Sequence, residues 1–310
     1  MNITCVEPLG ISQENFESIK VDFENKGHRF SYYMDRNESE QVLIDRMKDS
    51  DIVIISNIPL KQHVLEACGN LKMLSVAFTG LDHIDLEYCK QHGITVKNAA
   101  GYSTTAVSEL AVGLMIDVMR KITELDLATR NGGTRNNYLG IELRGKTVGI
   151  VGTGAIGSAT IKLLKAFGCN ILAYSRTERQ EIMALGVKYC TLDTLVAESD
   201  IISLHVPLNN ETFHLIDSRL ISMMKPSAIL INTARGNVVD IDALALALKN
   251  GSIRGAGIDV FEKEPPLDTN HPLLSAPNCV VVPHIGYASR EAFDIRAGIV
   301  LDNVRNFLNC

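Results

Sequence analysis

Residues 147–157 read Thr-Val-Gly-Ile-Val-Gly-Thr-Gly-Ala-Ile-Gly, so that an apolar strand runs directly into a glycine-rich turn. A second apolar strand, Asn170–Tyr174, follows one predicted helix later. In such a βαβ unit, glycines at this spacing permit a tight turn, close approach of a pyrophosphate and close packing of the helix on the strand. The helix also points free N–H groups at the phosphates. The stretch therefore predicts a dinucleotide site, and its expected phosphate-binding residues are Gly152, Gly154, Ala155, Ile156 and Gly157.

The end of the second strand indicates which dinucleotide binds. An NAD site usually places Asp or Glu about 20 residues after the glycines, where it bonds the ribose hydroxyls. Here Ser175 occupies that place, and Arg176 and Thr177 follow it. A hydroxyl and a guanidinium would bind a 2′-phosphate that a carboxylate would repel. We therefore expect NADP(H). NAD(H) remains the alternative, in which Arg176 and Arg179 only solvate the start of a helix.

The composition excludes several classes of protein. With 310 residues, 46% hydrophobic and 21% charged, the chain is long enough for two soluble globular domains. A net charge of −6 without a basic cluster argues against a nucleic-acid surface. No signal peptide is recognisable, and no apolar run approaches the roughly 20 residues that cross a bilayer. The seven cysteines are scattered without metal-ligand spacing, which favours free thiols in a reducing cytoplasm and no metal site.

The chain alternates short β-rich runs with helical stretches, which is typical of parallel α/β sheets. We expect a smaller first domain formed by residues 1–98 together with 286–310, whose last helix returns near 289–308. The dinucleotide domain is expected to span residues 99–285, inserted into the first. A long apolar helix is predicted over residues 103–130, too apolar to be half solvated.

Arg235, Glu264 and His284 each follow the end of a predicted strand of the second domain. Ligands of open α/β sheets lie beyond the carboxyl ends of the strands. Histidine titrates near neutrality, so His284 would protonate the alkoxide that hydride addition to a ketone leaves. Glu264 would orient the imidazole, and Arg235 would clamp a carboxylate and polarise the adjacent carbonyl. Each residue alone has a structural alternative: a strand-end histidine, a polar loop or a surface charge. Their combination favours a reductase site.

These motifs resemble those of the D-isomer-specific 2-hydroxyacid dehydrogenase family. The resemblance covers nearly the whole chain and is densest between Phe78 and Gly286. It depends on the runs Thr79-Gly-Leu-Asp-His-Ile-Asp85, Asn98-Ala-Ala-Gly-Tyr-Ser-Thr104, Gly152–Gly157, His205-Val-Pro207, Thr233-Ala-Arg-Gly236, Asp259-Val-Phe-Glu-Lys-Glu264 and Pro283-His-Ile-Gly286.

The resemblance implies a Rossmann dinucleotide domain inserted into a smaller flavodoxin-like substrate domain, and a homodimer in which the residue 103–130 region embraces the partner. It implies a catalytic set of Arg235, Glu264 and His284. Substrate binding is implied for Thr79 and Gly80, with Phe78 beside them. Further cofactor contacts are implied for Thr104, His205, Val206, Pro207, Thr233, Ala234 and Asp259.

The turn before Thr79 reads Ser75-Val-Ala-Phe78 and lacks the arginine that phosphoglycerate-using relatives carry there. Phe78 and Leu81 add apolar bulk near the expected substrate. The sequence therefore predicts a cytoplasmic, NADPH-preferring reductase of a small 2-keto acid such as glyoxylate or hydroxypyruvate. Two alternatives remain open: an NAD-dependent D-lactate or D-glycerate dehydrogenase, and a dinucleotide-sensing binding protein resembling a corepressor.

Overall fold

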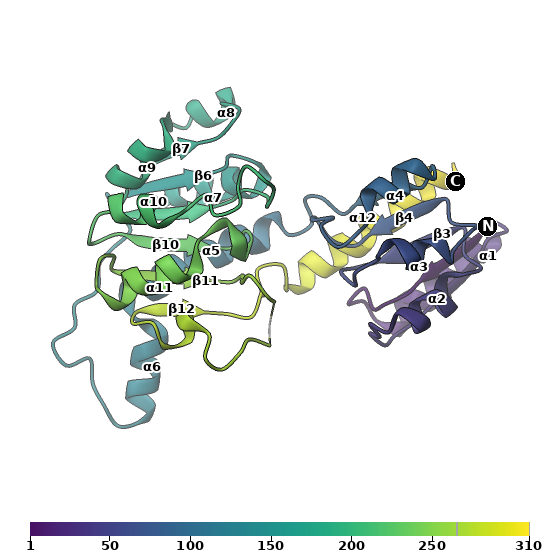
Figure 1. Cartoon of the computed structure of the whole chain (residues 1–310), viewed down its shortest axis with the longest axis horizontal. Helices are drawn as coiled ribbons and strands as arrows, with labels where there is room; N and C mark the ends of the chain where they lie inside the picture. The colour runs from purple at the N-terminus through teal and green to yellow at the C-terminus, as the bar shows by residue number, and fades with distance from the viewer. Residues whose placement is uncertain (265, 310) are drawn as a thin grey trace. The chain divides into compact units, whose positions relative to one another are not determined.

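In the computed structural model, which describes residues 1–264 and 266–309, the chain forms two compact units (Figure 1). One unit comprises Met1–Ser103 and Ala288–Cys310, and the other comprises Thr104–Tyr287. The second unit is thus inserted into the first along the chain. The predicted bounds of the substrate domain (1–98 with 286–310) and of the dinucleotide domain (99–285) stay a prediction, as do the functions assigned to them. Pro265 and Cys310 lie outside the described residues.

The first unit has a five-stranded parallel sheet in the order β2-β1-β3-β4-β5, the flavodoxin-like order that the resemblance implies. Its strands are β1 (Asn2–Cys5), β2 (Arg29–Tyr32), β3 (Ile52–Ile55), β4 (Met73–Val76) and β5 (Thr95–Asn98). Its helices are α1 (Gln13–Asn25), α2 (Glu40–Met47), α3 (Gln62–Glu66), α4 (Leu86–Gln91) and α12 (Arg290–Leu308).

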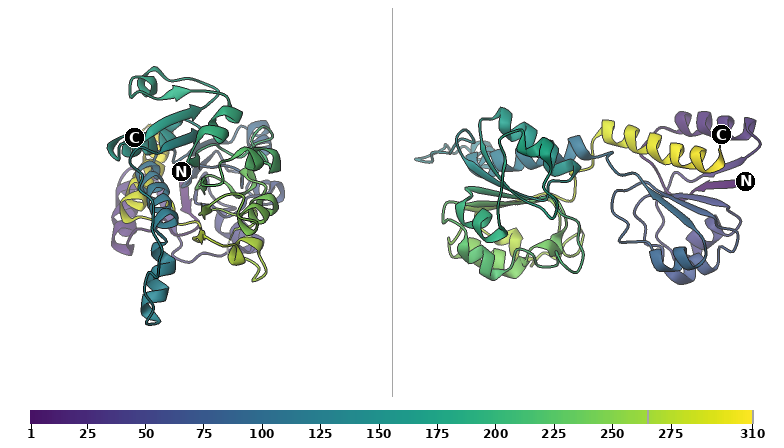
Figure 2. Two further views of the ribbon diagram at one scale, coloured as in Figure 1. Left: turned by 90° about the vertical axis from the view of Figure 1, so that its left-hand side faces the viewer. Right: turned by 90° about the horizontal axis from the view of Figure 1, so that it is seen from above.

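Helices cover both faces of this sheet, with α1 and α12 on one face and α2 and α3 on the other (Figure 2). The sequence explains the arrangement, because β3 is a run of four β-branched residues that are all buried. Helix α12 begins at Ser289, whose hydroxyl accepts a hydrogen bond from the Ala292 N–H at 3.1 Å. The last helix of the chain therefore completes the first unit, as the sequence predicts.

The second unit has a seven-stranded parallel sheet in the order β12-β11-β10-β9-β6-β7-β8. Its strands are β6 (Thr147–Val151), β7 (Asn170–Tyr174), β8 (Lys188–Tyr189), β9 (Ile201–Leu204), β10 (Ile229–Asn232), β11 (Gly255–Ile258) and β12 (Cys279–Val281). Its helices are α5 (Thr104–Arg120), α6 (Ile122–Arg130), α7 (Ala155–Ala166), α8 (Gln180–Met183), α9 (Leu192–Glu198), α10 (Ser218–Met223) and α11 (Ile241–Lys249), with 3₁₀ turns η1 (Gly236–Val238) and η2 (Pro272–Ser275).

Two hydrophobic cores sandwich this sheet. On one face, α5 and α7 pack side chains such as Met115 and Ile161 against β6 and β10. On the other face, α9, α10 and α11 contribute residues such as Leu220 and Leu244. The strand order reverses between β6 and β9, where chains leave for opposite sides of the sheet, and this is where an open α/β sheet has a ligand-binding crevice. The fold prediction of two parallel α/β sheets, one of them a Rossmann sheet, is confirmed.

The prediction of one long helix over residues 103–130 is wrong. The structure has two helices, α5 and α6, separated by Lys121 in the left-handed conformation with φ 53°. The Asp117 carboxylate accepts hydrogen bonds from the Thr123 N–H at 2.9 Å and the Thr123 hydroxyl at 2.5 Å. The Asp117 carboxylate thus takes the Thr123 N–H, which in a continuous helix would donate to a backbone carbonyl. The helix therefore ends here and the chain turns. Helix α6 has no buried residue and projects from the unit (Figure 1).

The glycine-rich turn brings the backbone at the end of β6 into close contact with the start of α7. A methyl group on Gly157 would collide with the Gly152 carbonyl oxygen, so this glycine permits α7 to pack at the end of β6. At Gly154 a methyl group would meet nothing within 4 Å. The two positions differ although they belong to one motif, since only Gly157 is needed for packing within the chain.

We therefore expect Gly157→Ala to lower the free energy of unfolding by at least about 2 kcal/mol, because backbone atoms must move to admit the methyl group. Gly154→Ala is the matched control and should cost less than about 1 kcal/mol. Urea unfolding of both variants without cofactor measures the difference. Equal stabilities would show that the turn does not require the close approach.

Candidate active site

The three residues predicted to carry the chemistry follow three strands that are neighbours in the seven-stranded sheet. Arg235 follows β10, Glu264 follows β11 and His284 follows β12. These strands pair side by side in parallel, so their carboxyl ends share one edge. The structure thus brings the predicted catalytic residues to one edge of one sheet.

A short turn after β10 holds the Arg235 backbone in place. The fully buried Asn232 accepts a hydrogen bond from the Ala234 N–H at 3.0 Å and donates one to the Arg235 carbonyl at 2.9 Å. At the next residue, Gly236, a methyl group would collide with the Phe261 carbonyl carbon. The turn therefore presses against the chain that leaves β11, which leads to Glu264.

The His284 imidazole is paired with a carboxylate. Its Nδ1 lies 2.9 Å from Glu264 Oε2, and the His284 side chain is 21% exposed while that of Glu264 is 49% exposed. Tyr287 packs edge-on against the imidazole, with 5.4 Å between ring centroids. Because Glu264 can only accept at neutral pH, Nδ1 donates to it. The pairing orients the ring and directs Nε2 away from Glu264, which suits Nε2 to exchange a proton with a substrate.

A second carboxylate, Asp259, holds the turn that carries His284. Its two oxygens accept hydrogen bonds from the Ile285 N–H at 2.6 Å and the Gly286 N–H at 2.9 Å. His284 itself has φ 53°, a conformation that a non-glycine residue adopts only when its surroundings stabilise it. Burial raises the pKa of Asp259 to about 6, against the two N–H groups and the His284 charge, which lower it. The resemblance assigns Asp259 to the cofactor, and the structure adds this positioning contact.

The crevice between β6 and β9 has the features of a dinucleotide site. A methyl group on Gly152 would collide with the His205 carbonyl oxygen and touch Val206, so the two strand ends lie in direct contact. Helix α7 starts at Gly154 without a side-chain cap, which leaves its first N–H groups available to an anion. His205 and Val206 thus lie beside the glycine-rich turn, and Pro207 follows them in the chain.

His205 is not suited to donate a proton to a substrate. Burial lowers the pKa of this imidazole to about 4, so the ring is neutral near pH 7. Its Nε2 lies 3.0 Å from the hydroxyl oxygen of the buried Ser203. Of the two histidines that follow strands of this sheet and were singled out from the sequence, only His284 has a carboxylate partner. Of these two histidines, His284 is therefore the better candidate for a proton donor.

One buried polar atom fits a bound nicotinamide. Among the described residues, the Thr233 hydroxyl oxygen is buried and has no hydrogen-bond partner. Thr233 follows β10 next to Ala234. A buried hydroxyl without a partner costs free energy, and a carboxamide group would satisfy it. Together with the open space at Gly154, this atom indicates that the site's residues fit a nicotinamide dinucleotide.

The predicted adenosine-ribose residues follow β7. Arg176 is exposed and forms an ion pair with Glu211, with Nη1 and Oε2 separated by 3.3 Å.

Thr104, predicted to approach the nicotinamide, is the first residue of α5 and belongs to the seven-stranded unit. Phe78, Thr79 and Gly80 follow β4 in the five-stranded unit, where the Thr79 carbonyl accepts a hydrogen bond from the Asn98 side chain at 2.7 Å.

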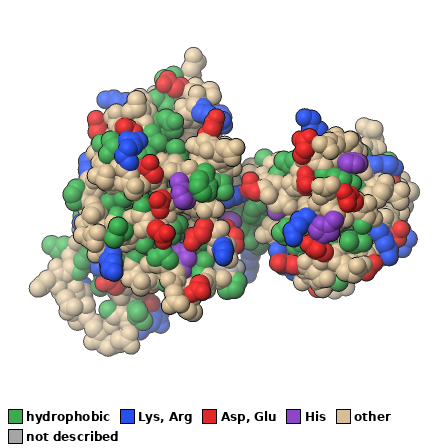
Figure 3. Space-filling view, viewed as in Figure 1, with side chains coloured by type: hydrophobic (Ala, Val, Ile, Leu, Met, Phe, Trp, Pro, Cys, Tyr) green, Lys and Arg blue, Asp and Glu red, His purple; other side chains and the backbone are tan. Residues whose placement is uncertain are grey.

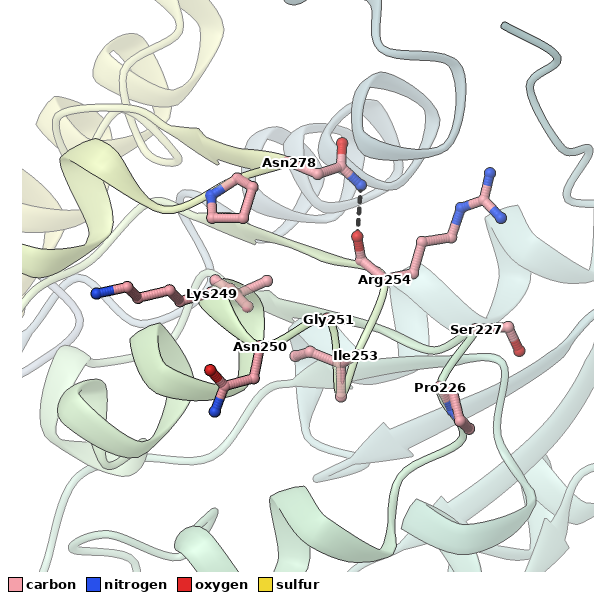
Figure 4. A pocket seen from close by; sticks show the side chains of 10 residues that line it. Pro226, Ser227, Lys249, Asn250, Gly251, Ile253, Arg254 and Asn278 are labelled. Carbon is pink, nitrogen blue, oxygen red and sulfur yellow. Dashed lines mark hydrogen bonds between the residues drawn. The ribbon is translucent and has the colours of Figure 1, made fainter.

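A hollow of about 680 Å³ in the seven-stranded unit lies elsewhere (Figure 4). It is lined by residues that precede β10, β11 and β12, including Ser227, Arg254 and Asn278, whose side chain donates to the Arg254 carbonyl at 2.7 Å. These residues lie at the amino ends of the strands, the edge opposite to Arg235 and His284. Ligands of such sheets bind at the carboxyl ends, so we do not assign the substrate to this hollow.

The described residues show no sign of a metal site or a membrane-spanning helix, and no basic field on the face drawn in Figure 3. In the described part of the chain, no group of three or more His, Cys, Asp or Glu side chains is placed to hold a metal ion. Within residues 1–264 and 266–309, no helix is long and apolar enough to span a lipid bilayer. On the face shown in Figure 3, acidic and basic side chains are interspersed rather than gathered into a basic field.

Sequence reasoning missed several residues that support the site. Asn232 carried a signal, since a polar residue ending a buried strand commonly bonds the following turn. His271 carried none: its Nδ1 accepts from the Leu273 N–H at 3.4 Å, and its Nε2 lies 3.1 Å from Glu262 in the loop that leads to Glu264. Tyr189 was equally hidden. Its hydroxyl accepts from the Arg179 N–H at 3.2 Å and donates to Thr153 at 3.0 Å.

Comparison with known proteins agrees with this geometry. A family model described as D-isomer specific 2-hydroxyacid dehydrogenase, NAD binding domain, matches residues 112–286. The chain belongs to the D-isomer-specific 2-hydroxyacid dehydrogenase family. It is 42% identical over 276 residues to a glyoxylate reductase of Thermococcus litoralis, an alignment that covers 86% of this chain and 83% of that protein.

Two solved structures of similar fold hold different cofactors. An acyclic imino acid reductase in complex with NADPH and D-Arg superposes with a TM-score of 0.88 at 30% identity, covering 100% of this chain and 97% of the other. The D-lactate dehydrogenase of Aquifex aeolicus complexed with NAD and lactic acid gives a TM-score of 0.87 at 30% identity, covering 99% and 96%. The chain is therefore an NAD(P)-dependent D-2-hydroxyacid dehydrogenase, and the alternative of a non-enzymatic dinucleotide sensor falls away.

The Asp259 contacts predict that the activity of the dehydrogenase falls in acid. Below a pH of about 6 this carboxyl group is protonated, and the protonated oxygen no longer accepts well from its N–H partner. The His284 turn then loses one of its two supports, so we expect kcat/KM to fall as the pH drops through about 6. Asp259→Asn should lower the rate and remove this acid limb, as measured in steady-state pH profiles. An acid limb that persists unchanged in Asp259→Asn would contradict the assignment.

Proposed function

We propose that this dehydrogenase works as a reductase of a small 2-keto acid, such as glyoxylate or hydroxypyruvate, and prefers NADPH. The product is the D-2-hydroxy acid. The observation that carries the proposal is the Glu264–His284 pair, 2.9 Å apart at the sheet edge that also bears Arg235. A carboxylate-oriented imidazole beside a guanidinium suits a substrate that has a carboxylate next to a carbonyl.

Each residue has a defined part in the proposed reaction. The bound cofactor supplies the hydride. Arg235 binds the substrate carboxylate and withdraws electron density from the adjacent carbonyl. His284 gives a proton from Nε2 to the oxygen that becomes the hydroxyl, while Glu264 stabilises the charged imidazole through Nδ1. Asp259 keeps the His284 turn in place. Thr104, Thr233, Ala234 and Asp259 are proposed to contact the nicotinamide end of the cofactor.

The proposed substrate binding also involves Phe78, Thr79 and Gly80 of the five-stranded unit. Backbone N–H groups at Thr79 and Gly80 would hold the carboxylate, and Phe78 would limit substrate size. Phe78 is 9% exposed, so its ring is available only in part. We further propose that the enzyme is cytoplasmic, since the six described cysteines are free thiols, as is usual in a reducing compartment.

A cofactor assay tests this proposal. Ser175 and Arg176 stand where an acid would select NAD, so kcat/KM should be higher with NADPH than with NADH for glyoxylate, hydroxypyruvate and pyruvate. One guanidinium–phosphate contact is worth about 1.5–3 kcal/mol, or roughly 10- to 100-fold. Arg176→Ala should erase most of that preference. Equal or better efficiency with NADH in the unmutated enzyme would favour the alternative, an NAD-dependent D-lactate or D-glycerate dehydrogenase.

His284→Ala should lower the rate of keto-acid reduction by roughly two to four orders of magnitude, because it removes the group proposed to protonate the product oxygen. Glu264→Gln keeps an oxygen that accepts from Nδ1 and should cost less. Stopped-flow reduction measures both, and fluorescence titration with NADPH should show that the cofactor still binds. A folded His284→Ala enzyme with undiminished activity would mean that the proton comes from another group.

The exposed helix α6 supports a homodimer. Ile122 and Leu127 on α6 are 52% and 63% exposed, and Leu139 in the following loop is 75% exposed. A groove beside them, between α5 and α6, is lined by Ile116, Arg120, Ile122, Leu125, Asp126 and Thr129. Apolar side chains gathered on a projecting helix usually mark an interface, and we propose that a second copy of this chain covers them.

Light scattering should therefore give twice the chain mass of 33.9 kDa at micromolar concentration. A charge on α6, as in Leu127→Lys, should shift the mass to that of one chain. Leu246→Lys is the control, because Leu246 is 59% exposed but lies on α11. A single-chain mass for the unmutated protein would refute the dimer.

A further inference from the structure

The ion pair between Arg176 and Glu211 joins two loops that lie on either side of the glycine-rich turn. Arg176 follows β7 and Glu211 follows β9, and both strands pair with β6. Their side-chain atoms lie 3.3 Å apart, and the two side chains are 77% and 73% exposed. The arginine expected at the adenosine ribose is thus already paired with a carboxylate from the opposite side of β6.

The turn that carries Glu211 is held by its own side chains. The Asn209 side-chain oxygen accepts hydrogen bonds from the Glu211 N–H at 2.9 Å and the Thr212 N–H at 3.1 Å. The Thr212 hydroxyl donates to the Pro207 carbonyl at 2.6 Å and accepts from the Asn209 N–H at 2.8 Å. These bonds fix the backbone on both sides of Glu211, from which its carboxylate reaches Arg176.

The segment that carries Arg176 is also anchored. Tyr189 links the Arg179 N–H to Thr153, which lies inside the glycine-rich turn. The Arg179 guanidinium pairs with Glu181 at 3.4 Å. Both sides of the Arg176–Glu211 pair are therefore attached to backbone that borders the predicted cofactor, so the pair is a feature of the crevice.

We propose that Glu211 is a specificity-determining residue that limits the preference for NADPH by competing with the cofactor's 2′-phosphate for Arg176. The inference depends on the proposed NADPH site. A phosphate group bears more charge and more acceptor oxygens than a carboxylate, so it displaces Glu211 from the guanidinium. The displaced carboxylate stays close to the phosphate and repels it. NADH has no phosphate at this position, so the Glu211 charge does not affect its binding.

Glu211→Gln removes the charge and keeps the side-chain shape. We expect kcat/KM with NADPH to rise about 1.5- to 5-fold, as for an exposed charge pair, while kcat/KM with NADH stays the same. In Arg176→Ala the same substitution should raise the NADPH value by less, since the two residues act on one phosphate. Glu198→Gln is the matched control: it removes the same charge at the exposed end of α9, before β9 begins, and should leave the ratio unchanged.

Binding of the adenosine half alone tests the inference without catalysis. Calorimetric titration of Glu211→Gln with adenosine 2′,5′-bisphosphate should show tighter binding than in the unmutated enzyme, with AMP unaffected, and the gain should shrink at high salt. If Arg176→Ala lowers affinity for the bisphosphate but Glu211→Gln changes nothing, the role of Glu211 is overturned and the NADPH site stands. If Arg176→Ala has no effect on the bisphosphate, the proposed NADPH site fails and the inference fails with it.

Discussion

Close contact between strand-end backbones is the constraint on which the site of this dehydrogenase depends. Gly152 and Gly157 permit the turn after β6 to touch the end of β9 and the start of α7, and Gly236 permits the turn after β10 to touch the chain leaving β11. A side chain at any of these positions would separate the loops by the width of a methyl group or more. The proposed cofactor crevice and the proposed catalytic edge both depend on these close backbone contacts.

Two carboxylates divide the task of holding His284. Glu264 pairs with Nδ1 of the ring and leaves Nε2 for the proposed substrate, whereas Asp259 bonds the backbone beyond His284, which has a positive φ. Asp259 is buried and Glu264 is half exposed. Burial makes the Asp259 carboxylate costly to ionise, which links the geometry of the turn to pH in a way that an exposed carboxylate would not.

The sequence predicted much of this arrangement from local patterns. The alternation of short β-rich runs with helical stretches predicted two parallel sheets and the insertion of one unit into the other along the chain. Because ligands of open α/β sheets bind at the carboxyl ends of the strands, the sequence predicted that Arg235, Glu264 and His284 lie at one edge of the sheet. The break at Lys121 could not be predicted in the same way, because it depends on the Asp117 side chain bonding a backbone N–H in the next helix. Contacts such as Tyr189 to Thr153 and Arg176 to Glu211 join residues distant in the chain, and no periodicity encodes them.

The direct test of the account is to follow both hydrogens that reach the keto acid. Hydroxypyruvate would be reduced with NADPH that carries deuterium at both C4 positions of the nicotinamide, and the glycerate would be separated by chiral chromatography and analysed by mass spectrometry. The account predicts D-glycerate with deuterium on C2 in the unmutated enzyme and a solvent isotope effect on turnover, because an exchangeable proton reaches the product oxygen. L-glycerate, or a product without deuterium, would contradict it.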